Sequence, residues 1–94
     1  MLPGIARTLR LLGKRVRALR LVGKLTQEQA AESAKLDEKH WQDIEGGRTN
    51  PTVASLVGVA RALDVPLAKL FESGNDEELS QAPPSSPRTR RLDP

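Results

Sequence analysis

The sequence predicts an all-α protein of five short helices, and three observations lead to this class. Apolar residues recur three or four positions apart along most of the chain, which is the spacing of an α-helix. Residues that cap helices stand directly before several of these stretches. Glycine or proline residues then separate one stretch from the next, at points where helices commonly end.

Length and composition narrow the class further. The 94 residues allow one domain, and a chain of this size buries only about 60–65% of its unfolded surface. Its stability therefore depends on dense helix packing or on a partner. The chain has no cysteine, so no disulfide framework is expected, which suits the cytoplasm of a bacterium. No apolar run approaches the roughly 20 residues of a membrane span, so we expect no membrane association.

The first helix is predicted over about residues 5–21, with Pro3 near its start and Gly23 after its end. One apolar stripe along it has spacings of four, three, four and three: Ile5, Leu9, Leu12, Val16 and Leu19. Residues 1–24 also hold seven basic residues and no acidic one, in a protein of net charge +3. Such a block indicates a polyanionic partner or surface. Transit peptides share this composition, but they are rich in serine, which this stretch lacks.

The second and third helices are predicted from their capping residues. Thr26 and Gln29 have the spacing of a capping box, so a helix should cover residues 27–34. Asp37 is an N-cap-type residue before a helix over residues 38–45, and two glycines then let the chain leave with positive φ. Only residues 35–36 remain as connection, so the two helices must cross steeply. Their shared contact is expected to consist of Ala31, Ala34, Leu36, Trp41 and Ile44.

Two further helices and a tail complete the chain. Thr52 is a candidate N-cap for a helix that ends near residues 63–64, and Pro66 keeps its predecessor extended before a last helix over about residues 67–71. After Ser73 almost nothing can be buried, so we predict a domain over residues 1–73 and a disordered tail over residues 74–94. The residues expected in the core are Leu12, Val16, Leu19, Ala31, Ile44, Leu56, Ala60, Leu63 and Leu70. Trp41 faces Ile44, which favours burial over the alternative that its ring stacks on a base or a partner.

Little in the sequence could support catalysis, so we expect no enzyme, no cofactor and no metal. His40 is the only histidine, cysteine is absent, and no carboxylates are paired at a metal-binding spacing. The glycine pair at residues 46–47 lacks the rest of a phosphate-binding fingerprint, and we interpret it as a helix stop.

These segments resemble the helix-turn-helix domain of the phage Cro and repressor type, the XRE family of bacterial regulators. The resemblance covers about residues 8–72 and rests on several separated motifs in the right order: Leu12–Arg20, Leu25–Ala31, Ile44–Pro51 and Leu56–Phe71. It implies a five-helix, lambda-repressor-like fold. Lys35 stands where the family's turn commonly has glycine, and a left-handed conformation there costs on the order of 1 kcal/mol. Lys24 also stands where the family usually has glycine, so the exit from the first helix is expected to differ in detail. A larger Trp41 and the smaller Ala30 and Ala34 compensate in volume.

The resemblance implies a sequence-specific DNA-binding transcriptional regulator, in particular a repressor, whose helix 38–45 enters the major groove of double-stranded DNA. The base contacts that it implies are Glu38, Lys39, Gln42 and Asp43, with His40 at the margin. The implied phosphate contacts are Gln27, Arg48, Thr49 and Asn50. Arg20 and Glu45 occupy positions at which the family forms an internal ion pair, so their role is structural.

A homodimer is also expected, at least on DNA. Two copies of the reading helix about 34 Å apart would recognise a palindromic operator with far greater discrimination than one copy. The interface is expected to consist of Leu67, Leu70 and Phe71 with part of the fourth helix, because a short terminal helix exposes apolar surface.

The charge of the reading region leaves a second function open. Residues 26–50 hold three basic and six acidic residues, a balance of −3, whereas attraction to phosphate supplies most non-specific affinity for DNA. The alternative is a protein-binding helix-turn-helix module, such as an antitoxin or accessory subunit. Its protein partner would contact the tail or the helix over residues 38–45.

Overall fold

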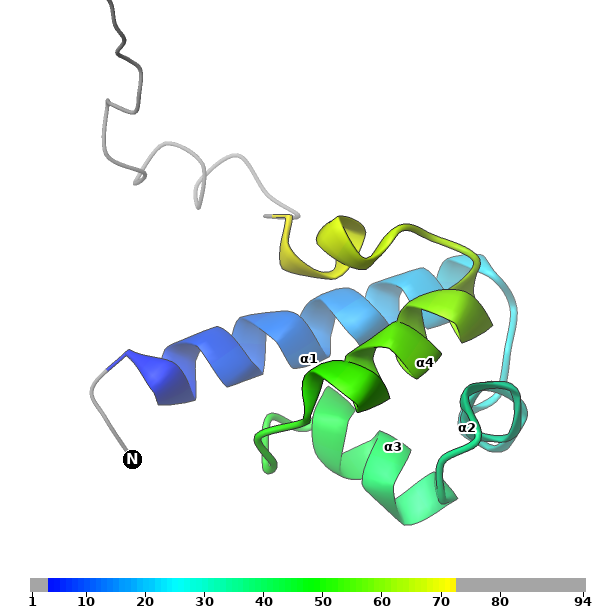
Figure 1. Cartoon of the computed structure of the whole chain (residues 1–94), viewed down its shortest axis with the longest axis horizontal. Helices are drawn as coiled ribbons and strands as arrows, with labels where there is room; N and C mark the ends of the chain where they lie inside the picture. Colours follow the sequence, from blue (N-terminus) through cyan, green and yellow to red (C-terminus); the bar gives the residue numbers. More distant parts are fainter. Residues whose placement is uncertain (1–3, 73–94) are drawn as a thin grey trace, which may run out of the picture.

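The computed structural model describes residues 4–72, and all regular structure in this range is helical (Figure 1). Four α-helices follow one another: α1 (Ile5–Val22), α2 (Gln27–Ala34), α3 (Glu38–Glu45) and α4 (Val53–Leu63). The all-α class is confirmed, and the predicted bounds of α2 and α3 agree with the structure. The fifth element, η1 (Leu67–Phe71), is a 3-10 helix rather than an α-helix. The predicted tail over residues 74–94 lies outside the described residues.

The helices pack in a simple arrangement. α1 is the longest element, and α4 lies alongside it (Figure 1). The α2–α3 pair covers one side of these two helices, and η1 lies on the other side. Within residues 4–72, none of the helices combines the length and the apolarity needed to cross a membrane. The same residues contain no group of histidines and carboxylates that could hold a metal ion.

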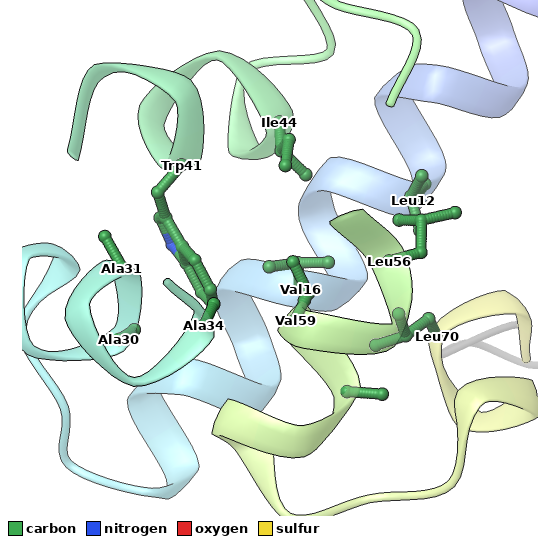
Figure 2. Packing of buried hydrophobic residues seen from close by; sticks show 11 residues of the cluster. Leu12, Val16, Ala30, Ala31, Ala34, Trp41, Ile44, Leu56, Val59 and Leu70 are labelled. Carbon is green, nitrogen blue, oxygen red and sulfur yellow. The ribbon is translucent and has the colours of Figure 1, made fainter. Parts of the chain in front are cut away.

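Trp41 has the largest of the fully buried side chains in the described residues. Its side chain is fully buried, and Figure 2 shows the ring beside Ala31 and Ala34 of α2. The small α2 residues make room for the indole, as the predicted compensation of volumes requires. Nearly all predicted core residues are buried, but Leu19 and Leu63 are only partly buried and pack at the edge of the core. Both lie near the C-terminal ends of their helices, α1 and α4, where fewer neighbours surround them.

The helix ends explain how α2 and α3 are set against each other. Thr26 and Gln29 form the predicted capping box, with distances of 3.0 Å and 2.9 Å for its two hydrogen bonds. Lys35 ends α2 in the left-handed conformation at φ 61°, as its position in the turn predicts. Asp37 stands at the N-cap of α3, as predicted, and its side chain makes no capping hydrogen bond.

The end of α1 follows the same rule as the turn after α2. Gly23 keeps a right-handed conformation at φ −79°, and Lys24 takes the left-handed one at φ 60°. The left-handed residue is therefore Lys24, at the position where the resembled family commonly has glycine. The amide of Leu25 then donates to the carbonyl oxygen of Arg20 at 3.1 Å. This bond brings the start of α2 close to the buried side chain of Arg20.

Two glycines inside helices allow close helix contacts. A Cβ atom at Gly13 of α1 would lie 2.6 Å from the carbonyl oxygen of Ile44 and still closer to that of Glu45. A Cβ atom at Gly58 of α4 would lie 2.8 Å from the carbonyl oxygen of Ala34. Backbone atoms of α1 and α4 therefore rest directly on the C-terminal ends of α3 and α2, which fixes α3 in place.

Candidate nucleic-acid interface

A buried polar cluster holds the C-terminal end of α3. The carboxylate of Glu45 accepts hydrogen bonds from Arg20 Nε at 2.6 Å and Nη2 at 3.1 Å. It also accepts from Trp41 Nε1 at 2.6 Å and from Gln27 Nε2 at 3.0 Å. Arg20 uses its remaining Nη1 to donate to the carbonyl oxygen of Leu25 at 2.9 Å. One carboxylate therefore joins α1, α2 and α3, since each of these helices provides a donor.

Burial and hydrogen bonding act against each other on Glu45. Its side chain is only 5% exposed, and burial alone would raise the pKa of the carboxyl group. The hydrogen bonds from Arg20, Trp41 and Gln27, together with the charge of Arg20, outweigh burial and hold the pKa below its ordinary value of 4.5. Glu45 is therefore ionised at neutral pH and balances the buried charge of Arg20.

The opposite face of α3 is turned to solvent. Trp41 and Ile44 point into the core, so the residues between them point outward. Glu38 and Lys39 are exposed, and Gln42 and Asp43 are half-buried. These four predicted base contacts are spaced so that they share one helix face. His40 does not join them fully, because its ring is half-buried and its Nε2 atom is buried without a hydrogen-bond partner among the described residues.

The charges on this face are paired with one another. Lys39 Nζ lies 3.0 Å from Asp43 Oδ1 and 3.1 Å from Oδ2, and Arg48 Nε lies 3.1 Å from the same Oδ1 atom. The hydrogen bond from Lys39 has the largest effect on the pKa of Asp43. Desolvation raises this pKa, but the hydrogen bonds and charges of Lys39 and Arg48 together hold it below the ordinary 3.8. Gln42 Nε2 also donates to Glu38 Oε2 at 3.4 Å.

Arg48 is folded back over the end of α3. Its Nη2 atom donates to the carbonyl oxygen of Gln42 at 3.1 Å, in addition to the contact with Asp43. The guanidinium group occupies the space above Gly46, where a Cβ atom would lie 2.6 Å from Arg48 Cζ. The predicted phosphate contact is therefore bonded within the free domain, where it also satisfies a carbonyl group of the last helical turn.

The other predicted phosphate contacts lie near the same end of α3. The hydrogen bond from Gln27 to Glu45 places the first turn of α2 beside the last turn of α3. Thr49 is half-buried and Asn50 is exposed in the loop that follows α3. The predicted phosphate contacts therefore lie near the C-terminal end of α3, although the amide nitrogen of Gln27 is already bonded within the domain.

Basic residues of α1 border this region. A side chain at Gly47, just after α3, would come within 3.0 Å of the Cα atom of Arg10, so the two backbones touch there. Arg10, Lys14 and Arg17 are exposed. Arg15 belongs to another surface, since its Nε donates to the carbonyl oxygen of Lys69 in η1 at 3.2 Å.

One of the three residues predicted for the dimer interface is buried within the protomer. Leu70 is 1% exposed and packs in the core of its own protomer, so it offers no apolar surface to a partner and its assignment was wrong. Leu67 and Phe71 of η1 are exposed, as are Val53 and Val57 on α4.

Sequence reasoning missed three contacts of the site. Trp41 and Glu45 are four residues apart, as are Lys39 and Asp43, and this spacing brings side chains together on a helix. The same spacing could have predicted both contacts. Nothing in the spacing predicts that Arg48 folds back over Gly46, because that contact depends on the loop conformation.

The fold and the outward face of α3 define a helix-turn-helix domain of the Cro and repressor type. The family described as helix-turn-helix domain matches residues 11–71, and the chain belongs to it. An immunity repressor protein of Bacillus phage phi105 is 41% identical over 59 residues, which are 63% of this chain. The chain spans only 41% of the length of that repressor.

Solved structures agree with this assignment. The restriction-modification controller protein C.AhdI from Aeromonas hydrophila is 33% identical, with a TM-score of 0.66 over 67% of this chain and 96% of that chain. A hypothetical transcription factor from Neisseria is 24% identical, with a TM-score of 0.71 over 87% of this chain and 93% of that chain. The second likeness concerns the fold alone.

Proposed function

We propose that this protein is a sequence-specific DNA-binding transcriptional regulator of the repressor kind, a cytoplasmic binding protein and not an enzyme. The observation that carries the proposal is the two-sided character of α3. One side is anchored by Trp41, Ile44 and the Glu45 cluster, and the other presents polar side chains to solvent. A rigid helix with a polar outward face suits the reading of base edges in the major groove.

The proposed division of contacts follows from the chemistry of the side chains. Lys39 can donate to guanine, Gln42 can pair with adenine through two hydrogen bonds, and Glu38 can accept from the amino group of cytosine. Asp43 is the fourth proposed base contact, and His40 lies at the margin of the set. Phosphate contacts are proposed for Gln27, Arg48, Thr49 and Asn50, with the exposed basic residues of α1 adding attraction to the flanking backbone.

Two relatives support this proposal. The phage protein is named an immunity repressor and is 41% identical over the shared segment, and C.AhdI is named a controller protein. We extend the regulatory role to this chain on that basis. We also propose a homodimer on a palindromic operator, with Leu67 and Phe71 in the interface, because their exposed apolar side chains would be buried by a second copy.

Selection of bound sites from a random DNA pool tests the proposal directly. The preferred duplex and a scrambled duplex are then titrated at several salt concentrations. Affinity for both should fall steeply with salt, and the preferred duplex should remain the tighter ligand. Glu38→Gln should strengthen binding to the scrambled duplex and lower the preference at one base pair, by about 1–3 kcal/mol if Glu38 accepts from cytosine.

Glu32→Gln is the matched control, because it removes an exposed carboxylate from α2 and not from the outward face of α3. It should leave the preference for every base pair unchanged. If no sequence is selected and binding does not depend on salt, the DNA-binding proposal fails. The acidic balance of residues 26–50 would then favour the protein-binding module, whose partner contacts the same face of α3.

A further inference from the structure

Asp43 binds two cations that the proposed function assigns to DNA. Its carboxylate lies 3.0 Å from Lys39 Nζ and 3.1 Å from Arg48 Nε, and both contacts involve Oδ1. Lys39 is the proposed donor to guanine, and Arg48 is a proposed phosphate contact. In the free domain both cations therefore bind a carboxylate of α3 itself.

The position of Arg48 depends on Gly46. The guanidinium group lies directly above this residue, where a Cβ atom would meet Arg48 Cζ at 2.6 Å and Nη1 at a still shorter distance. Gly46 itself has a right-handed conformation at φ −84°, which any residue can adopt. What glycine provides here is space for the arginine and not an unusual backbone angle.

We propose that Asp43 is an internal substitute for a DNA phosphate, which holds Arg48 and Lys39 on α3 until DNA displaces it. The inference rests on the proposed DNA-binding function. It makes Asp43 a positioning residue for the two cations. It also assigns to Gly46 the role of permitting the docked position of Arg48.

The proposal follows from the way guanidinium groups bind oxyanions. Carboxylate and phosphate oxygens compete for the same N–H donors of arginine. The side chains of Arg48 and Lys39 are 61% and 77% exposed, so both can leave Asp43 without disturbing the core. Surface ion pairs contribute little free energy, so phosphate can displace the carboxylate at a small cost.

This exchange of partners would also sharpen sequence preference. Any DNA that binds Arg48 and Lys39 separates these cations from Asp43. The unpaired carboxylate then lies close to the negatively charged phosphate backbone, and this repulsion weakens binding. A sequence that places a cytosine amino group at Asp43 gives the carboxylate a new donor. Only the operator therefore offsets the repulsion between Asp43 and the backbone. Asp43 thus lowers the affinity for arbitrary DNA more than the affinity for the operator.

Gly46→Ala tests the proposal without changing any charge. The new methyl group should displace the flexible end of Arg48, which is the nearest group that it would meet. Affinity for a random duplex at low salt should rise about 1.5- to 5-fold, which corresponds to the release of one surface ion pair. Asp43→Asn should give a larger gain, because it frees Lys39 as well and removes a negative charge.

The matched control is Gly46→Ala in a chain that already carries Arg48→Ala. With no arginine to displace, the alanine should leave the affinity for random DNA unchanged. An equal gain in both backgrounds would overturn the proposal, since the effect would then not pass through Arg48. Weaker binding by Gly46→Ala alone would also overturn it, because the docked arginine would then be the form that favours DNA.

A second measurement separates this inference from the proposed function. In the absence of DNA, NMR titration of the Asp43 carboxyl group should show its pKa rising toward 3.8 in Gly46→Ala. If the wild-type chain binds DNA but the variant gains no affinity, only the substitute-phosphate inference is wrong. If the wild-type chain binds no DNA, both the inference and the proposed function are wrong.

Discussion

Asp43 and Glu45 are two carboxylates two residues apart on α3, and each is bonded to an arginine and to a second donor on its own helix. Glu45 is 5% exposed and is joined to Arg20 and Trp41, whereas Asp43 is 24% exposed and is joined to Arg48 and Lys39. Both carboxylates pair with an arginine, but the second donor on the helix is the uncharged indole N–H of Trp41 for Glu45 and the ammonium group of Lys39 for Asp43. We therefore expect burial to decide whether such a carboxylate holds the fold or remains free to exchange partners.

The largest expected effect is on the free energy of unfolding when Glu45 is replaced, compared with the same replacement at Asp43. Glu45→Ala leaves the charge of Arg20 buried without a partner and removes the acceptor of Trp41, so the free energy of unfolding should fall by about 3–5 kcal/mol. Since small domains are stable by only about 5–15 kcal/mol, part of the variant should be unfolded at 37 °C. Urea unfolding followed by Trp41 fluorescence measures the change.

Asp43→Ala is the control for this comparison. Its partners are exposed and return to water, so the urea midpoint should change little. Equal losses at the two positions would contradict the distinction between a buried structural carboxylate and an exposed exchangeable one.

The same contrast appears at two glycines: Gly13 lies against the backbone of Glu45, and Gly46 makes room for the arginine that binds Asp43. In Gly13→Ala the methyl group would collide with backbone carbonyl oxygens of Ile44 and Glu45, which cannot move without separating α1 from α3. The free energy of unfolding should fall by about 1–3 kcal/mol, as in other overpacked contacts. Gly46→Ala collides only with the mobile end of Arg48 and should leave the stability close to that of the wild type. Thermal unfolding of the two variants side by side gives the comparison.

A Gly13→Ala variant as stable as Gly46→Ala would show that α1 is not in rigid contact with α3. The Glu45 cluster would then need another explanation for its burial. Intrinsic helix propensity cannot explain a loss at Gly13, because Gly13 lies inside α1, where alanine is favoured over glycine, whereas Gly46 is the C-cap of α3.

Much of the fold follows from local signals that the sequence states directly. Thr26 and Gln29 satisfy each other within one turn, so the start of α2 needs no information from the rest of the chain. The side chain of Asp37 lacks its capping bond and Leu70 points inward, because both depend on how neighbouring elements pack. In the sequence Gly13 is one position of a family motif. Its role in helix contact depends on the position of α3, which the sequence around Gly13 does not specify.

The candidate site divides in the same way. Helix periodicity is sufficient to place Glu38, Lys39, Gln42 and Asp43 on one outward face once Trp41 is assigned to the core. Periodicity is not sufficient for Arg48, which lies beyond the end of α3 and reaches Asp43 through a loop. Long flexible side chains after a helix take positions set by the space around them, and the space above Gly46 is a property of the folded loop.

A smaller effect is expected from acid, which should lower the free energy of unfolding through Glu45. Because the pKa of Glu45 in the folded protein is below its ordinary 4.5, the ionised group stabilises the fold above that pH. This contribution should be lost as pH falls below 4.5 and through the lower folded pKa, with a slope of at most about 1.4 kcal/mol per pH unit. Glu45→Gln should show a shallower loss between pH 5 and pH 3 in urea unfolding. A wild-type slope unchanged by the substitution would contradict this assignment.

Salt should produce the smallest and most selective difference. At 1 M salt the screening length is about 3 Å, so exposed charges are largely screened and buried ones are not. The pKa of Asp43 should therefore rise toward 3.8 as salt increases, because its partners Lys39 and Arg48 are exposed. The pKa of Glu45 should hardly move, since its donors lie inside the cluster and include the uncharged groups of Trp41 and Gln27. NMR titration of both carboxyl groups in one sample at low and high salt measures the two shifts under identical conditions. Equal responses would mean that the Glu45 cluster is open to solvent ions, and Glu45 would then be as free as Asp43 to exchange its partners.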